Sequence, residues 1–138
     1  MRFMIIVKAT KDSEAGVMPD ESMFKTMADY HEELVKAGML IDASGLQASS
    51  KGWRIDYDGE KRTVSDGPFA ETKELIAGYT IIKAESPEEA LEWSKRFPNP
   101  VGPNKKAQIE VRRLFELEDF KQSAAIDRFR KMETSPNK

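Results

Sequence analysis

Residues 66–74 read DGPFAETKE and lie between two stretches of strand-like alternation. Gly67 and Pro68 predict a sharp bend, because glycine reaches backbone conformations closed to other residues and proline holds φ at about −65°. Phe69 adds an apolar side chain. The remaining ionisable residues are Asp66, Glu71, Lys73 and Glu74. This nonapeptide (residues 66–74) therefore predicts a stiff, charged connection between strands.

The segment before the nonapeptide predicts a β-hairpin. Apolar and polar residues alternate over residues 53–57, Asp58-Gly59 signals a tight turn, and residues 61–65 form the returning strand. An arm of this size is not stable by itself. We therefore expect it to pack on the main sheet or on another subunit.

The segment after the nonapeptide predicts a strand, a helix and a second strand. Residues 75–84 alternate as a strand, with Gly78, Thr80 and Ile82 on one face. Residues 86–89, Ser-Pro-Glu-Glu, form a capping box that starts a helix ending at Pro98. The apolar face of this helix is expected to hold Ala90, Trp93, Ser94 and Phe97. Residues 107–115 predict the last core strand, with Ile109, Val111 and Phe115 facing one way.

The N-terminal part predicts a strand over residues 2–9, a loop over residues 10–16 and then a helix. This helix opens at Pro19-Asp20 and ends near Ala37, with Gly38 as a left-handed cap. At helical spacing one apolar arc collects Met23, Phe24, Met27, Ala28, Tyr30, Leu34 and Val35, and His31 falls inside it. A weaker strand is expected over residues 39–41 and 45–46.

The composition changes after residue 115, so we expect a domain over residues 1–115 and a C-terminal helical extension and tail over residues 116–138. The apolar stripe of the extension comprises Leu117, Phe120, Ala124, Ala125, Ile126, Phe129 and Met132, and residues 134–138 are expected to form a frayed tail. Such a stripe needs a surface to pack on. Packing on its own domain or on a sister subunit is one interpretation, and recruitment of a foreign partner is the other.

Without the hairpin the elements run β-α-β-β-α-β, which is the α+β ferredoxin-like arrangement of an antiparallel sheet with two helices on one face. Side chains on the other face are expected to be Met4, Ile6, Tyr79 and Ile81 together with Gln108, Glu110 and Arg112. A face that is partly apolar is not left to water. We therefore expect a homodimer in which a second sheet packs on this face and encloses a half-polar cleft for a small organic ligand.

Composition narrows the classes of function. The chain has 138 residues, 39% hydrophobic and 33% charged, as expected of one globular domain. A net charge of −2 without a basic block argues against nucleic acid as a partner. No apolar run approaches the roughly 20 residues of a membrane span, and the N-terminal run is too short for a signal peptide, so we expect a cytoplasmic protein without a membrane partner.

The sequence predicts no cofactor. Cysteine is absent, which removes disulfides, cysteine-ligated metals and thiol nucleophiles. A single histidine and no EF-hand spacing give little support for a metal site. Neither a P-loop nor a dinucleotide fingerprint is present.

The nonapeptide, the following Gly78-Tyr79 and the segment EEALEW at residues 88–93 resemble the YCII-related family in its DGPF-motif branch. Gly38 and residues 45–47 fit as well, and the resemblance covers residues 1–115. It implies a dimeric α+β barrel of ferredoxin-like protomers, in a family with no defined activity for most members. In related YCII proteins a histidine of the first helix and an aspartate are proposed as a catalytic pair. His31 lies in the first helix, whereas no aspartate matches around residues 98–100.

His31 and Asp66 are the candidate catalytic residues. Histidine titrates near neutrality and suits a general base. The alternative for His31 is a partly buried core position with a backbone or tyrosine hydrogen bond. Asp66 has the alternative of capping loop N–H groups. The candidate ligand-binding residues are Trp53, Phe69, Glu71, Lys73, Glu74, Tyr79 and Arg112. For them the alternatives are packing of the aromatic rings and pairing of Glu71 or Glu74 with basic neighbours.

Three hypotheses of function follow. The first is a small-molecule pocket protein that binds a small organic acid or performs proton transfer on it, as an isomerase or a lyase does. The second is a non-catalytic dimeric interaction module that docks through its C-terminal helix. The third is a structural dimer whose cleft is filled by side chains. The sequence identifies no substrate.

Overall fold

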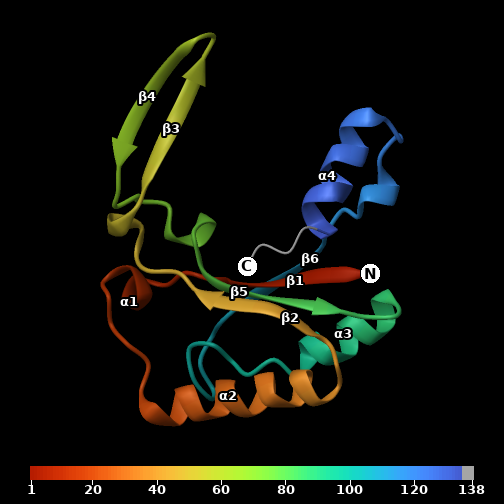
Figure 1. Cartoon of the computed structure of the whole chain (residues 1–138). Helices are drawn as coiled ribbons and strands as arrows, with labels where there is room; N and C mark the ends of the chain where they lie inside the picture. The colour runs from red at the N-terminus through yellow and green to blue at the C-terminus, as the bar shows by residue number, and fades with distance from the viewer. Residues whose placement is uncertain (135–138) are drawn as a thin grey trace.

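The computed structural model describes residues 1–134, and its centre is a four-stranded antiparallel sheet in the order β2-β5-β1-β6. The strands are β1 (Arg2–Lys8), β2 (Leu40–Gly45), β5 (Ile76–Lys83) and β6 (Ile109–Arg113). The helices α2 (Glu21–Lys36) and α3 (Pro87–Lys95) cover one face of this sheet (Figure 1). The order and layering confirm the predicted α+β ferredoxin-like fold.

The core fills the space between the sheet and the two helices. It consists of Phe3, Ile5, Tyr30, Leu34, Met39, Ile82, Ala84, Ala90 and Phe97. Tyr30 also links the helices, because its hydroxyl donates to the backbone oxygen of Trp93 at 2.8 Å. Burial of the Tyr30 ring raises the pKa of its hydroxyl to about 12, so Tyr30 remains a neutral donor at all ordinary pH values.

Helix α2 begins and ends where the sequence predicts. The Asp20 carboxylate accepts from the backbone N–H of Met23 at 2.9 Å, and Gly38 has φ +71° after the last turn. The buried stripe is narrower than the predicted arc, because Phe24 and Val35 are 48% and 61% exposed. Since α2 contacts a single sheet layer, only the row that contains Tyr30 and Leu34 reaches the core.

Two stretches near the N-terminus differ from the prediction. Residues 10–16 are not a plain loop but contain the helical turn α1 (Lys11–Glu14). Thr10 and Ser13 cap it reciprocally, each hydroxyl accepting from the other's backbone N–H. The predicted weak strand is one continuous strand, β2, with an irregularity between Leu40 and Asp42.

The hairpin strands β3 (Trp53–Asp58) and β4 (Lys61–Asp66) form a separate two-stranded sheet. Gly59, with φ +62°, makes the predicted turn. This hairpin arm (residues 53–66) stands on the side of the main sheet that the helices leave bare (Figure 1). Its residues are all exposed, so the expectation that the arm packs on the main sheet of its own chain is wrong.

The C-terminal segment stands on the same side of the sheet, at its other end (Figure 1). It contains the 3₁₀ turn η3 (Leu117–Asp119) and the helix α4 (Ala124–Thr134). Phe115 is 70% exposed and stacks on Phe120 with ring centroids 4.8 Å apart, so its predicted place in the core is wrong. Of the predicted tail, Thr134 belongs to α4 and residues 135–138 lie outside the described residues. Within residues 1–134 no helix is both long and apolar enough to cross a membrane.

Adjacent residues of α2 provide a test of this packing. Leu34→Ala removes a fully buried side chain and is expected to lower the free energy of unfolding by about 2–5 kcal/mol. Val35→Ala, one position further on the exposed side, is expected to change it by less than about 0.5 kcal/mol. Urea denaturation of both variants measures the difference. Equal losses would show that α2 is rotated from the orientation described.

Candidate functional site

An open pocket of about 510 Å³ lies at the foot of the hairpin arm. Its wall combines aromatic rings, from Trp53 and Phe69, with the charged side chains of Glu14 and Arg54 and the hydroxyl of Ser49. Phe69 belongs to the nonapeptide, so the stretch singled out from the sequence forms part of this wall. Mixed apolar and polar lining of this size suits a small organic molecule.

The nonapeptide is held against the turn that precedes β3. The backbone N–H of Phe69 donates to the Ser49 hydroxyl at 2.9 Å, and the N–H of Gly67 donates to the backbone oxygen of Gly52 at 3.0 Å. A Cβ atom at position 67 would lie 1.9 Å from the Ser49 carbonyl oxygen. Gly67 is therefore required by this close approach and not by a left-handed backbone. The peptide bond between Gly67 and Pro68 is cis.

Ser49 also binds Glu14 from the helical turn α1. The Glu14 carboxylate accepts a short hydrogen bond from the Ser49 hydroxyl and a second bond from the Ser49 N–H at 2.8 Å. These two hydrogen bonds hold the pKa of Glu14 below its usual range. Glu14 therefore contributes a fixed negative charge to the pocket wall. Through Ser49, three segments distant in sequence meet at one hydroxyl group.

Two cationic residues line the pocket, Lys51 and Arg54, and Arg54 is the one that contacts the nonapeptide. Its guanidinium lies over the Phe69 ring, 3.8 Å from the centroid, in cation–π geometry. One nitrogen also lies 3.8 Å from a Glu71 carboxylate oxygen. Both partners of this ion pair are about half exposed, so the pair is weak and can be exchanged. Glu71 thus pairs with a basic neighbour, as its alternative interpretation predicted.

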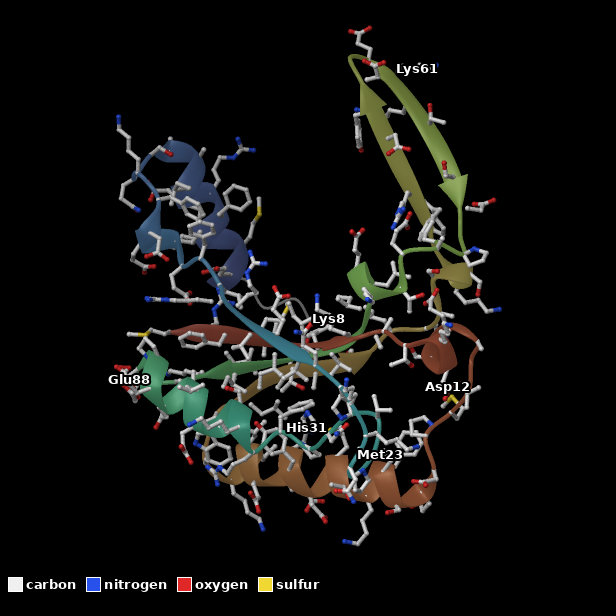
Figure 2. The ribbon with its side chains drawn as sticks, turned by 180° about the vertical axis from the view of Figure 1, so that it is seen from behind. Lys8, Asp12, Met23, His31, Lys61 and Glu88 are labelled. Carbon is white, nitrogen blue, oxygen red and sulfur yellow. The ribbon has the colours of Figure 1, made fainter. Side chains whose placement is uncertain are left out.

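His31 lies on the other side of the sheet, between α2 and β5 (Figure 2). Its Nδ1 donates to the backbone oxygen of Met27 at 2.7 Å, because a carbonyl oxygen can only accept. In the neutral ring Nε2 then accepts from the hydroxyl of Thr80 at 2.8 Å. Thr80 is 2% exposed, so this pair satisfies a buried hydroxyl. The arrangement matches the core interpretation of His31.

The sheet face opposite the helices carries two sets of interacting polar side chains. The Lys8 ammonium, which points to this face in Figure 2, lies 3.1 Å from the Glu110 carboxylate, and Arg112 lies 3.2 Å from it. These two cations lower the pKa of Glu110. Tyr79 donates its hydroxyl to Asp42 at 3.0 Å. Tyr79 and Arg112 therefore lie on the predicted open face and do not line the pocket.

The remaining candidates, Asp66, Lys73 and Glu74, are not among the residues that line the pocket. Asp66 is exposed and pairs across the hairpin with Trp53, and no hydrogen bond reaches its carboxylate from the described residues. Lys73 and Glu74 lie in the short 3₁₀ turn η2 (Thr72–Glu74) and are exposed. The structure thus brings Trp53, Phe69 and Glu71 together around Arg54, and it separates His31, Tyr79 and Arg112 from them. Among residues 1–134, no three acidic or histidine side chains are grouped to hold a metal ion.

Sequence reasoning missed Arg54, Glu14 and Ser49. In the sequence Arg54 is one of the polar residues that alternate with apolar ones over residues 53–57, and its contact with Phe69 depends on how the arm leaves the domain. The hydrogen bond between Glu14 and Ser49 joins residues 35 positions apart, so no local sequence pattern predicts it. A local signal did exist for α1, namely the hydroxyl residues Thr10 and Ser13 at capping-box spacing.

Comparisons with known proteins identify a family and individual similar proteins. A family model described as YCII-related domain matches residues 1–118. An uncharacterized protein of Rhizobium meliloti (strain 1021), R00369, is 30% identical over 80 residues, which are 58% of this chain and 64% of that protein. The match therefore spans less than two thirds of that relative. A solved structure, 5-chloro-2-hydroxyhydroquinone dehydrochlorinase from Burkholderia phenoliruptrix AC1100 with 2,5-dihydroxybenzoquinone, has a TM-score of 0.46 and 16% identity, over 83% of this chain and 94% of that one.

The close approach of Gly67 to Ser49 leads to a prediction. In Gly67→Ala the added methyl group displaces the nonapeptide from Ser49, at an expected local cost of about 1–3 kcal/mol. The protection of the Phe69 amide against hydrogen exchange should then fall about tenfold or more. Gly52→Ala is the matched control, because its Cβ would lie 3.8 Å from the same carbonyl oxygen. Unchanged protection in Gly67→Ala would contradict the described contact.

Proposed function

The chain belongs to the YCII-related domain family, and on that premise we propose that it is a pocket protein of the DGPF-motif branch that binds a small organic acid. Residues 66–69, Asp-Gly-Pro-Phe, support the branch. The observation that carries the proposal is the Arg54 guanidinium held over the Phe69 ring in the wall of a pocket of about 510 Å³. A cation and aromatic surfaces at one site suit an acid with an apolar body.

The chemistry of the pocket wall favours an anionic group near Arg54. Guanidinium groups bind carboxylates through two parallel hydrogen bonds, and within residues 1–134 the carboxylate paired with Arg54 is that of the half-exposed Glu71. A ligand carboxylate can replace Glu71 at little cost, because an exposed ion pair is worth about 1 kcal/mol or less. The rings of Trp53 and Phe69 then receive the apolar part of the ligand.

The open face of the sheet supports a homodimer as the working form. Met4, Ile6 and Ile81 lie on this face and are half-buried within the single chain. The ion pair of Lys8 and Glu110 lies beside them. Two such faces packed together bury the apolar residues and leave the charged groups at the rim. In this dimer the pocket at the foot of the arm becomes one end of a cleft between the copies.

Proton transfer is the reaction class that we assign to this pocket. A carboxylate base removes a proton from a carbon of the bound acid. The proton then returns to another carbon in an isomerisation, or a leaving group departs in an elimination. Asp66 is the base in this proposal, because it pairs with the pocket residue Trp53 and its carboxylate is exposed. Glu14 is less suited, since its hydrogen bonds to Ser49 lower its basicity.

Binding of benzoate tests the pocket. We expect the wild-type protein to bind benzoate, with changes in the NMR signals of Trp53 and Phe69, and to bind benzyl alcohol more weakly. Arg54→Gln should weaken benzoate binding by about tenfold or more, since hydrogen bonds to charged groups contribute about 1.5–3 kcal/mol. Arg62→Gln is the matched control, because Arg62 also lies over a ring of the arm, Tyr57, but outside the pocket.

Two results would contradict the pocket. One is equal affinity for benzoate in Arg54→Gln and Arg62→Gln. The other is equal binding of benzoate and benzyl alcohol by the wild-type protein, since the proposed cation would then have no role.

Deuterium uptake from D₂O tests the proton-transfer step separately. Phenylpyruvate carries exchangeable protons on the carbon next to its keto group, and the wild-type protein is expected to accelerate their exchange above the buffer rate. Asp66→Asn should lose at least about 100-fold of this acceleration, as expected for removal of a general base. Asp58→Asn, at the far end of the arm, should retain it. Benzoate binding without any acceleration would leave a binding protein and exclude this reaction on this probe.

A further inference from the structure

The chain exposes more surface than a compact protein of its mass. Its accessible surface is 10399 Å², whereas a folded monomer of 15.7 kDa exposes about 7,300 Å². The excess of about 3,000 Å² is larger than the roughly 800 Å² that each partner buries in a standard interface. A second copy that covers only the open face of the sheet would not bury this excess surface. Two elements that stand above this face, the hairpin arm and α4, also expose apolar side chains.

The hairpin arm is one of these elements, and the apolar side chains on one of its faces are largely exposed. The same face carries Asp66 opposite Trp53, and Arg62, whose guanidinium lies over the Tyr57 ring. Trp53, Ile55 and Tyr57 alternate along β3, and Val64 pairs with Ile55 from β4. Their exposed fractions are 64%, 42%, 66% and 61% in this order. The opposite face is polar and carries Arg54, Asp56, Thr63 and Ser65. A two-stranded sheet with this alternation becomes stable when its apolar face is packed against another element.

Helix α4 is the second element. Ile126, Phe129 and Met132 recur at three-residue spacing along one side of the helix. Phe129 and Met132 are 54% and 62% exposed, while the main contact of α4 within its own chain is with η3. This apolar stripe is therefore also largely uncovered in the single chain.

The positions of the two elements restrict how a second copy can approach. The arm and α4 stand at opposite ends of the same sheet face (Figures 1 and 2). At about 3.3 Å per strand residue and 1.5 Å per helix residue, they rise about 20 Å and 16 Å. Face-to-face sheets lie only about 10 Å apart. Each element must therefore pass beside the partner's sheet and meet an element of the partner.

A twofold axis in the plane of the interface leaves two arrangements. It brings either the arm of one copy beside α4 of the other, or like elements together. The arm carries four acidic and three basic residues within residues 53–66, and α4 carries three basic and two acidic residues. Only the unlike pairing brings net charges of opposite sign together.

We propose that the hairpin arm of each copy packs its apolar face on α4 of a second copy, so that the partner's helix covers Trp53 and closes the pocket. Trp53 belongs both to the apolar face of the arm and to the pocket wall. The pocket is then complete only in the dimer. This inference rests on the homodimer of the proposed function and adds which elements meet.

Disulfide trapping tests the pairing. Because the chain has no cysteine, only the introduced cysteines can form disulfides. Chains with Tyr57→Cys and chains with Phe129→Cys, carrying tags of different length, are co-expressed and oxidised with copper phenanthroline. A covalent dimer that contains one chain of each kind is expected. Each variant expressed alone should remain mostly uncrosslinked. A dimer of two Tyr57→Cys chains would instead show the like-with-like arrangement and overturn the proposal.

Light scattering on the wild-type protein separates this inference from the proposed function. A monomer at micromolar concentration overturns both the homodimer and the pairing. A dimer without the mixed crosslink overturns only the pairing, and α4 is then left for a different protein partner.

A second readout tests closure of the pocket. Phe129→Asp is expected to lower benzoate affinity about tenfold, although Phe129 lies outside the pocket of its own chain. Val35→Asp, an exposed apolar position on α2, is the matched control and should leave affinity unchanged. Equal affinities in the two variants would overturn the closure by α4. Absence of benzoate binding in the wild-type protein would instead contradict the pocket itself.

Discussion

The hydroxyl group of Ser49 joins three segments of the chain at the foot of the hairpin arm. It donates to the Glu14 carboxylate and accepts from the Phe69 N–H. The Ser49 oxygen, in the turn before β3, is therefore hydrogen-bonded both to α1 and to the nonapeptide. The direction of the arm depends on this junction, because Gly67 follows β4 directly and lies against the Ser49 carbonyl. The place of Arg54 above Phe69, and with it one of the positive charges of the pocket, depends on that direction in turn.

The two faces of the sheet differ in how far their side chains are packed and hydrogen-bonded within the single chain. On the side of the helices every described buried polar side chain has a hydrogen-bond partner, and the bond between His31 and Thr80 is one example. Toward the arm and α4, half-buried apolar residues lie beside Lys8 and Glu110. The pocket and its accessible charged side chains therefore lie on the second side, whereas the single histidine lies on the first.

The sequence predicted the elements of the fold because their signals are local. Alternation, the cap residue Asp20 and the capping box at Ser86 mark strands and helix ends without knowledge of the rest. It predicted the width of the helix face less well, since exposure of Val35 depends on how many layers α2 touches. The pocket was predicted only in part. Phe69 and Trp53 carry visible signals, whereas the contact of Glu14 with Ser49 exists only after the chain has folded.

The position of Arg54 on a strand of the arm has a thermodynamic consequence. Under the proposed function, a ligand that draws the guanidinium from Glu71 would act on the same strand that carries Trp53, so occupancy of the pocket and ordering of the arm would be linked. Linkage is reciprocal. If a contact that orders the arm raises the affinity for the ligand by some factor, the ligand strengthens that contact by the same factor. An arm that moves freely would therefore lower the affinity for the ligand.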